Sequence, residues 1–320
     1  MRRGRDVGEL VALARAGDPR SVARLVSLVE DGDPLLPDVA AALAPLAGRA
    51  QVIGLTGSPG VGKSTLTSEL VRVYRAEGQR VGVLAVDPSS PFTGGAILGD
   101  RVRMQDHATD PGVYIRSMST RGQLGGLSAA TPQAVRVLEG AGCEVVLIET
   151  VGVGQAEVEV ASLADTTLVM LAPGMGDAIQ AVKAGILEIA DVFIVNKADR
   201  DGADATHRDI QGMIALGDRG PGDWRPVVVR TVAARAQGID EVAGAIAKHR
   251  AWLAEGGQLQ RRRIHRASVE VEQIALGTLR ARIGSLADQV ALPALAAEVV
   301  AGRLDPYAAA ARLLESLAQP

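Results

Sequence analysis

The sequence predicts an α/β fold whose centre is a mainly parallel, doubly wound sheet, with helical extensions before and after it. Between residues 51 and 231, short apolar runs of strand length alternate with segments of helix length. This alternation is typical of parallel strands joined by helices that cover both faces of the sheet. Outside the alternating region, apolar residues recur at helical spacing. We therefore expect a helical N-terminal extension at 1–48, a central domain at 49–255 and a helical C-terminal extension at 256–320.

The apolar runs expected to form strands share a length of four to seven residues and a high content of Val, Ile and Leu. They are residues 52–56, 80–86, 113–116, 144–148, 166–171, 192–195 and 227–231. Sheets of this kind bind ligands at the carboxyl ends of their strands. The motifs that follow these runs are therefore the candidates for chemistry.

The two extensions show helical periodicity and no chemical motif. A helical tail such as 256–320 packs on a partner subunit or folds back over its own domain, and we expect the first, as a dimerisation arm of a homodimer. An arginine run, Arg261 to Arg263, opens it. No aromatic residues are interleaved with these arginines, so we interpret the run as a solvated helix face.

Composition excludes several classes of protein. The net charge is −3 and aromatics make up 2% of the chain, which does not favour nucleic-acid binding. A single cysteine, Cys143, rules out an intrachain disulfide framework and a cysteine-based zinc site, and its apolar neighbours predict a buried thiol. The N-terminus resembles neither a signal peptide nor a transit peptide, and no stretch approaches the length of a membrane span. We expect a cytoplasmic protein without a membrane partner.

The loop after the first predicted strand fits the phosphate-binding motif G-x-x-x-x-G-K-[ST]. Glycines let backbone N–H groups converge on phosphate oxygens, and the start of the following helix favours negative charge. The lysine of the motif can reach the β- and γ-phosphates, and its serine can ligate Mg²⁺. The full motif between a strand and a helix favours a P-loop NTPase fold over a turn that is glycine-rich by chance. The residues are Gly57, Ser58, Pro59, Gly60, Val61, Gly62, Lys63, Ser64 and Thr65.

The strand at 192–195 is followed by Asn196-Lys197-Ala198-Asp199, the N-K-x-D element of GTP-binding proteins. The Asp199 carboxylate can accept hydrogen bonds from N1–H and the N2 amine of guanine. Adenine offers neither donor, so ATP would leave the carboxylate unpaired, and a site of this kind discriminates strongly. Lys197 can lie along the base, and Asn196 can tie this loop to the phosphate loop. A polar turn is the alternative, and the preceding phosphate loop disfavours it.

A second loop, after the last predicted strand, can complete the base pocket. Val232, Ala233 and Ala234 can supply backbone N–H groups to the guanine O6. G proteins commonly have Ser-Ala where this chain has Val232-Ala233, so a serine hydroxyl contact is lost while backbone contacts can remain.

Carboxylates at strand ends predict a magnesium site. Glu149 opens Glu-Thr-Val-Gly, which is similar to the D-x-x-G loop of G proteins, and the Gly152 N–H can meet the γ-phosphate. Asp87 and Asp100 are the other acidic candidates. Mg²⁺ usually takes one or two carboxylates beside water and phosphate, so not all three need bind it directly. We expect Asp100, in a glycine-rich loop, to be a switch residue that engages when GTP binds.

Together these motifs resemble the MeaB/ArgK family, the GTPases associated with methylmalonyl-CoA mutase. Beyond the phosphate loop and Asn196–Asp199, the resemblance rests on segments 86–90, 94–100, 149–155 and 173–177. It implies a homodimeric GTPase that acts as a chaperone for an adenosylcobalamin-dependent acyl-CoA mutase. In that role it would gate cofactor loading and guard the mutase against inactivation.

The resemblance also implies roles for individual residues. It places Lys63 and Ser64 on the phosphates and Mg²⁺, and Asp100 and Glu149 around the metal. Asp177 and Lys183 would lie in a loop that couples nucleotide state to the mutase, although Lys183 by its spacing alone is a helix-surface lysine. An older family label invokes a transport ATPase or kinase, and the guanine-reading element argues against ATP.

Phosphoryl transfer to water needs positioning and charge neutralisation above all. The sequence assigns no water-orienting glutamine or arginine finger, although Gln155, Arg103 and Arg121 are candidates. We therefore expect slow hydrolysis without a partner, on the order of 10⁻³ s⁻¹. A nucleotide-dependent metallochaperone would need clustered ligands, whereas the four histidines are dispersed in the sequence. Two further hypotheses stay open, a transport-associated P-loop kinase and a binding module that holds nucleotide without hydrolysing it.

Overall fold

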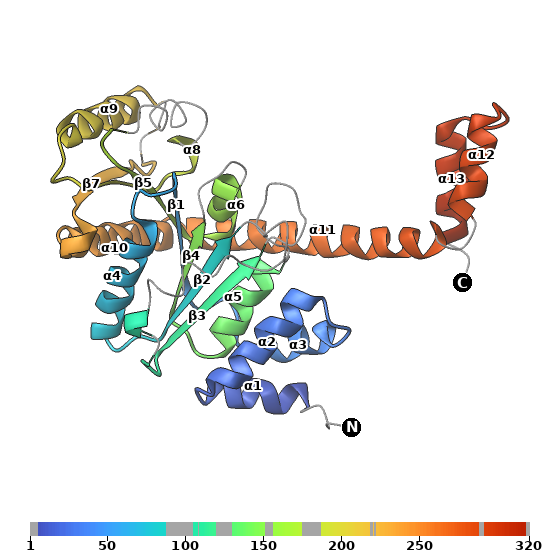
Figure 1. Cartoon of the computed structure of the whole chain (residues 1–320), viewed down its shortest axis with the longest axis horizontal. Helices are drawn as coiled ribbons and strands as arrows, with labels where there is room; N and C mark the ends of the chain where they lie inside the picture. The colour runs from blue at the N-terminus through green and yellow to red at the C-terminus, as the bar shows by residue number, and fades with distance from the viewer. Residues whose placement is uncertain are drawn as a thin grey trace. The chain divides into compact units, whose positions relative to one another are not determined.

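The computed structural model of the chain describes residues 6–87, 105–107, 109–119, 130–150, 156–174, 187–217, 220, 222–287 and 291–317 (Figure 1). Two compact units make up the chain, residues 1–263 and residues 264–320. The first holds the sheet and its covering helices, and the second is helical. In the part of the chain that the structure describes, no helix is both long and apolar enough to cross a lipid bilayer.

Among the described residues, seven parallel strands form a single sheet in the order β3-β2-β4-β1-β5-β6-β7. Their bounds are β1 (Gln51–Gly57), β2 (Val81–Asp87), β3 (Val113–Ser119), β4 (Val145–Thr150), β5 (Thr166–Leu171), β6 (Val192–Asn196) and β7 (Val227–Thr231). The predicted parallel, doubly wound sheet is confirmed. Every residue of the central strands β1, β4, β5 and β6 is buried, because helices cover both faces of the sheet.

Alternate side chains of the strands enter different cores. Ile53 and Leu147 pack with α4 (Lys63–Ala76) and α10 (Ile239–Glu255) on one face. Val52 and Val146 pack on the other face with α5 (Thr131–Gly140) and α6 (Ala156–Leu163). On this second face, α9 (Ala203–Leu216) covers β5 and β6. The remaining short elements of this unit are η1 (Gln105–His107), α8 (Leu187–Ile189) and η3 (Ala233–Arg235).

Three N-terminal helices extend the second core: α1 (Val7–Arg15), α2 (Pro19–Asp31) and α3 (Leu36–Leu43). Asp18 caps α2 by accepting a hydrogen bond from the Ser21 amide at 3.0 Å, and Gly32 ends the helix with φ +61°. Leu43 packs in the same cluster as Leu138 of α5. The helical extension predicted at the N-terminus is therefore part of the core beside the sheet.

Cys143 lies in this core, as its apolar surroundings predict. Its residue is 4% exposed, and burial raises the pKa of the thiol to about 12. The thiol is accordingly protonated at neutral pH.

Helix α11 (Gln258–Ala287) begins at the end of the first unit and continues into the second. The second unit also contains α12 (Ala291–Val300) and α13 (Pro306–Leu317), so the described part of this region is helical, as the sequence predicts. Asp305 caps α13 by accepting the amide of Tyr307 at 2.9 Å. Large apolar side chains of this unit are exposed, among them Ile264, Val271, Ile274, Leu276 and Leu279.

The prediction of a solvated arginine face is wrong for two of the three arginines. Arg262 pairs with Asp191 at 3.0 Å, and Arg263 pairs with Asp165 at 2.9 Å, whereas Arg261 is exposed. The two aspartates precede β6 and β5 and are almost fully buried. A buried carboxylate needs a partner, which explains why the start of α11 is held against the sheet.

Candidate nucleotide-binding site

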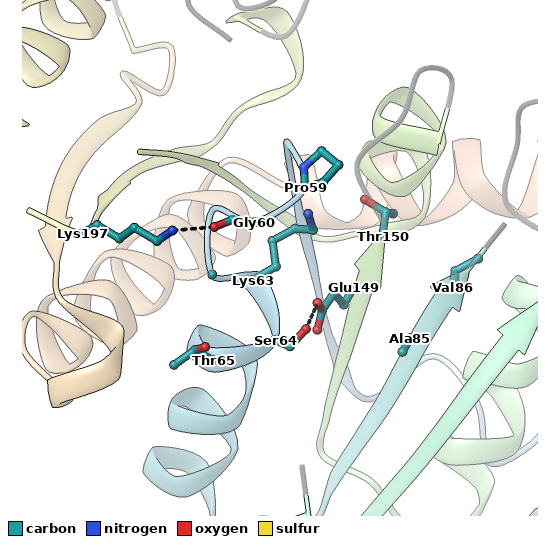
Figure 2. A pocket seen from close by; sticks show the side chains of 11 residues that line it. Pro59, Gly60, Lys63, Ser64, Thr65, Ala85, Val86, Glu149, Thr150 and Lys197 are labelled. Carbon is teal, nitrogen blue, oxygen red and sulfur yellow. Dashed lines mark hydrogen bonds between the residues drawn. The ribbon is translucent and has the colours of Figure 1, made fainter. Parts of the chain in front are cut away.

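The phosphate loop connects β1 to α4 at the carboxyl edge of the sheet (Figure 2). Gly57 and Gly62 have φ values of +141° and +103°. A Cβ at Gly57 would collide with the carbonyl oxygen of Met170, and one at Gly62 would collide with the Asn196 side chain. Glycine is therefore required at both positions for backbone conformation and for space. The loop borders a cavity of about 370 Å³.

Lys63 is the first residue of α4, and its side chain folds back over the loop. Its ammonium group donates to the carbonyl oxygens of Gly57 at 2.7 Å and Ser58 at 3.1 Å. The residue is 6% exposed. A buried ammonium group at the start of a helix, beside loop amides, provides the positive potential that phosphate oxygens require.

Glu149 of β4 and Ser64 of α4 meet at the floor of this cavity (Figure 2). The Ser64 hydroxyl donates to Oε1 of Glu149 at 2.6 Å. Because its proton is directed at the carboxylate, the oxygen of Ser64 can still offer a lone pair to a cation. A hydroxyl and a carboxylate are hard oxygen ligands, and the pair therefore fits Mg²⁺. Here Ser64 and Glu149 would hold the metal beside the phosphates.

Asn196 joins three loops of the site. Its amide group donates to the carbonyl oxygen of Val61 at 2.7 Å, which ties β6 to the phosphate loop. Its Oδ1 accepts from the Thr231 hydroxyl and the Ala233 amide, each at 3.0 Å, which ties β6 to the loop after β7. Asn196 is 3% exposed, so these bonds are shielded from water. The expected link between base loop and phosphate loop is present in the structure.

Lys197 makes a second link of the same kind. It is a non-glycine residue with positive φ, +57°, and its ammonium group donates to the carbonyl oxygen of Gly60 at 2.7 Å (Figure 2). A left-handed conformation in a lysine is uncommon and costs energy. The bend it creates separates the buried Asn196 from the more exposed Asp199.

Asp199 lies at the solvent-facing side of the site. Its carboxylate pairs with Arg235 of η3 at 3.5 Å, and the two side chains are 37% and 64% exposed. The Val232 amide donates to the Gln237 carbonyl at 3.1 Å, and the Ala233 amide donates to Asn196. Of the three residues expected to face the guanine O6, Ala234 lies on the exposed part of the turn.

Comparison with known proteins agrees with this geometry. The family model described as methylmalonyl Co-A mutase-associated GTPase MeaB matches residues 22–287. The chain belongs to the MeaB family. The family match spans both the phosphate loop and the Asn196–Asp199 loop, which the structure joins at one cavity.

Relatives of this MeaB-family chain cover 79–97% of its length. A Pyrococcus abyssi protein that carries a provisional GTPase name is 45% identical over 314 residues, 97% of each chain. GTPase ArgK of Escherichia coli is 38% identical over 262 residues, 79% of each chain. The crystal structure of an LAO/AO transport system kinase has a TM-score of 0.71 and 26% identity, and the match covers 98% of each chain. The P-loop NTPase fold predicted from the sequence is confirmed.

Several residues predicted for the MeaB-type site lie outside the described residues. These are Asp100, Gly152, Asp177 and Lys183, together with the three hydrolysis candidates Arg103, Arg121 and Gln155. Asp87 is described through its backbone, which ends β2 opposite Ser119 at the carboxyl edge of the sheet. The roles given to these residues stay predictions.

Two residues of the site were missed by the sequence analysis. Arg235 pairs with Asp199. It lies four residues after Thr231, in a segment that matches no known motif. Thr67 donates to Oε2 of Glu149 at 3.0 Å. The signal that could have found Thr67 was its spacing, since residues three apart on a helix share a face and Ser64 is already in the motif.

Proposed function

We propose that this MeaB-family GTPase couples GTP binding and hydrolysis to the service of an adenosylcobalamin-dependent acyl-CoA mutase. By the description of the family, that partner is methylmalonyl-CoA mutase. The GTPase would gate cofactor loading and protect the mutase against inactivation. The observation that carries the nucleotide part is the Asn196 network, which fixes a base-reading loop to a phosphate loop. The family match supports the partner.

Different residues of the site would perform different parts of nucleotide binding and phosphoryl transfer. Lys63 and the loop amides would neutralise charge on the β- and γ-phosphates. Ser64 and Glu149 would hold Mg²⁺, which supplies further neutralisation of phosphate charge when bound. Asp199 would select guanine by accepting two hydrogen bonds from its edge. Turnover would be slow until a partner completes the site.

A homodimer is part of the proposal. Ile264, Val271 and Ile274 of α11 are between 51% and 66% exposed, and large apolar side chains exposed in series mark interaction surfaces. The C-terminal helices would then be the dimerisation arm, and the domain limits 1–48, 49–255 and 256–320 stay predictions.

A second function follows from one comparison. The similar crystal structure is named as a transport system kinase, and a kinase transfers phosphate to another molecule. Nucleotide choice separates the two functions, because the Asn196–Asp199 loop selects guanine in our proposal. Binding of ATP as tight as binding of GTP would favour the kinase.

The base-reading assignment is tested with Asp199→Asn. Replacing the acceptor carboxylate by an amide should lower GTP affinity and raise affinity for xanthosine triphosphate, whose edge offers an acceptor where guanine has an amine. Titration calorimetry with both nucleotides measures the change, and Asp204→Asn on the exposed start of α9 is the matched control. Unchanged GTP preference in Asp199→Asn would remove Asp199 from the base pocket.

The partner is tested by capture from cell extract. The chain is loaded with a non-hydrolysable GTP analogue, and retained proteins are probed for an adenosylcobalamin-dependent mutase. Phosphate release is then measured with and without the purified mutase. Absence of the mutase from the retained fraction, together with no change in phosphate release, would contradict the chaperone role.

A further inference from the structure

Both oxygens of the Glu149 carboxylate are held by hydroxyl groups from helix α4. Oε1 accepts from Ser64 at 2.6 Å, and Oε2 accepts from Thr67 at 3.0 Å. Glu149 is 5% exposed and Thr67 is fully buried, so the bond between them is shielded from water. The two hydroxyls lie three residues apart on one face of the first turns of α4.

The Thr67 hydroxyl has a single proton and two acceptors within reach. Oε2 of Glu149 and the carbonyl oxygen of Lys63 both lie 3.0 Å from its oxygen. A bond to an ionised carboxylate is about twice as strong as one between neutral groups. With Glu149 ionised, as a Mg²⁺ ligand is, the proton would go to its carboxylate, although a helical threonine ordinarily bonds the carbonyl one turn before it.

A glutamate at position 149 needs more hydrogen bonds than an aspartate to fix the position of its carboxylate. The side chain of Glu149 has one more rotatable bond than the aspartate of the D-x-x-G loop, so its carboxylate can take more positions. A carboxylate bonded at one oxygen can still rotate about that bond, whereas a hold at both oxygens fixes its plane. Groups that orient a metal-binding carboxylate in this way commonly change metal affinity about 10- to 100-fold when removed.

We infer that Thr67 is a positioning residue that fixes the Glu149 carboxylate for Mg²⁺-dependent retention of guanine nucleotide. The inference rests on the proposed function, because it assumes that Ser64 and Glu149 hold Mg²⁺ beside the phosphates. It adds a residue that lies outside the phosphate-loop motif. Thr67 acts through Glu149 and does not touch nucleotide itself.

The alternative for Thr67 is a purely structural role as a buried residue of α4. Two substitutions separate the roles. Thr67→Val keeps the shape and removes the hydroxyl, and Thr67→Ser keeps the hydroxyl and removes the methyl group. Thr206→Val is the matched control, because Thr206 is a buried helical threonine whose hydroxyl donates to the Gly202 carbonyl at 3.1 Å, in α9.

The experiment measures release of fluorescently labelled GDP from the full chain, in excess Mg²⁺ and in EDTA. In the wild type, Mg²⁺ should slow release. In Thr67→Val, that slowing should shrink about 10-fold, with release in EDTA unchanged. Thr67→Ser and Thr206→Val should retain the wild-type response to Mg²⁺. Thermal melting of each variant shows whether it is folded.

Three results would overturn the inference. Equal Mg²⁺ responses of Thr67→Val and the wild type would show that the hydroxyl does not position Glu149. A defect in Thr67→Ser as large as that in Thr67→Val would assign the effect to packing of the methyl group. Faster release from Thr67→Val in EDTA by the same factor would indicate a damaged phosphate loop. Failure of the proposed function looks different, because the wild type itself would then show no effect of Mg²⁺ on GDP release.

Discussion

Asn196 is the residue at which the two halves of the nucleotide site meet. Its buried side chain bonds Val61 of the phosphate loop and Ala233 of the loop after β7. Asn196→Ala should lower GTP affinity about 10-fold and the free energy of unfolding by about 1–3 kcal/mol, because buried partners are left without a hydrogen bond. Calorimetry and urea denaturation measure the two changes. Lys197→Met removes the more exposed bond to Gly60, so it should lower GTP affinity and the free energy of unfolding by less than Asn196→Ala does. Larger losses in Lys197→Met than in Asn196→Ala would contradict this account.

His249 predicts a pH dependence of stability. The residue is fully buried, and burial lowers the pKa of its imidazole from 6.5 to about 4, although Asp191 partly opposes the shift. The unfolded chain therefore binds a proton between pH 6.5 and 4 that the folded chain excludes. This contribution to stability is complete above pH 6.5, and up to about 3 kcal/mol is lost as the pH falls towards 4.

Tryptophan fluorescence provides the measurement. The chain has two tryptophans, Trp224 and Trp252, and their rings lie 4.7 and 5.8 Å from that of His249. Urea unfolding followed by this fluorescence should show the loss in the wild type and a flatter pH profile in His249→Gln. His265→Gln is the control, since His265 is exposed. Parallel profiles for the wild type and His249→Gln would assign the acid sensitivity to other groups.

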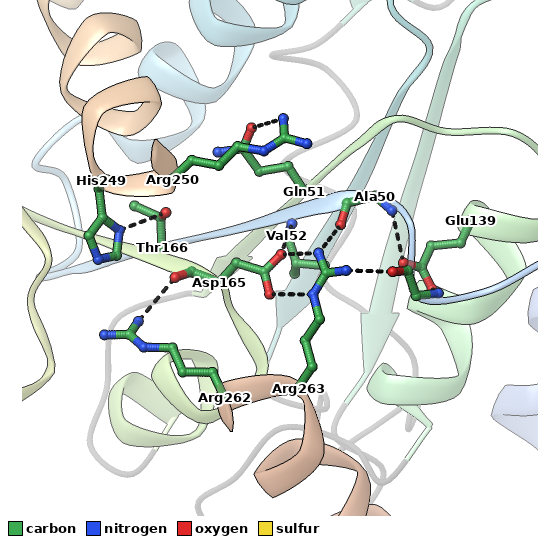
Figure 3. A network of polar contacts seen from close by, with 11 residues as sticks. Ala50, Gln51, Val52, Glu139, Asp165, Thr166, His249, Arg250, Arg262 and Arg263 are labelled. Atoms are coloured by element: carbon green, nitrogen blue, oxygen red, sulfur yellow. Dashed lines mark hydrogen bonds and ion pairs between the residues drawn. The ribbon is translucent and has the colours of Figure 1, made fainter. Parts of the chain in front are cut away.

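At the scale of elements, the start of α11 is fixed to the amino edge of the sheet (Figure 3). The Arg263 guanidinium donates to Asp165 at 2.9 Å and to the carbonyl oxygen of Ala50 at 2.9 Å. Asp165 in turn accepts the Val52 amide at 3.1 Å, at the start of β1. Arg263 thus connects α11 to the strand that leads into the phosphate loop.

Arg263→Ala should lower the free energy of unfolding by about 3 kcal/mol, because it leaves the buried Asp165 carboxylate without its cation. Thermal or urea unfolding measures the loss. Arg261→Ala, at the exposed arginine two residues before, should change stability by less than about 0.5 kcal/mol. Equal losses of stability in the two variants would show that Arg263 contributes no more than the exposed Arg261, as the predicted solvated helix face requires.

The elements also show how far sequence reasoning reaches. The strands were predictable because parallel strands buried on both faces are continuous apolar runs, as in β4 and β6. The phosphate loop and Asn196 were predictable because their chemistry fixes both residue type and spacing. The pairing of Arg263 with Asp165 was not, since the partners are 98 residues apart and neither belongs to a motif. Thr67 was missed although its spacing from Ser64 pointed to it, because it lies outside the phosphate-loop motif and its partner Glu149 is 82 residues away on another element.

On the scale of the whole molecule, the described residues of the nucleotide site all belong to the first unit. The phosphate loop, Glu149, Asn196 and Arg235 precede residue 236, and the unit continues to Arg263. The second unit, 264–320, contributes exposed apolar helices. Binding of nucleotide and association of subunits should therefore be separable.

A chain that ends at Arg263 should bind GTP with an affinity within about 2-fold of the full chain, because it keeps the sheet and both arginine pairs. It should be a monomer and so lose the dimer that we propose for the full chain, since it lacks the exposed apolar residues from Ile264 onward. Titration calorimetry and sedimentation measure affinity and mass.

A chain that ends at Gly257 is the control. It loses the arginines as well and should be less stable, since Asp165 and Asp191 then keep no guanidinium partner from α11. Weak GTP binding by a folded 1–263 chain would show that the second unit completes the nucleotide site, and a dimeric 1–263 chain would place the subunit interface in the first unit.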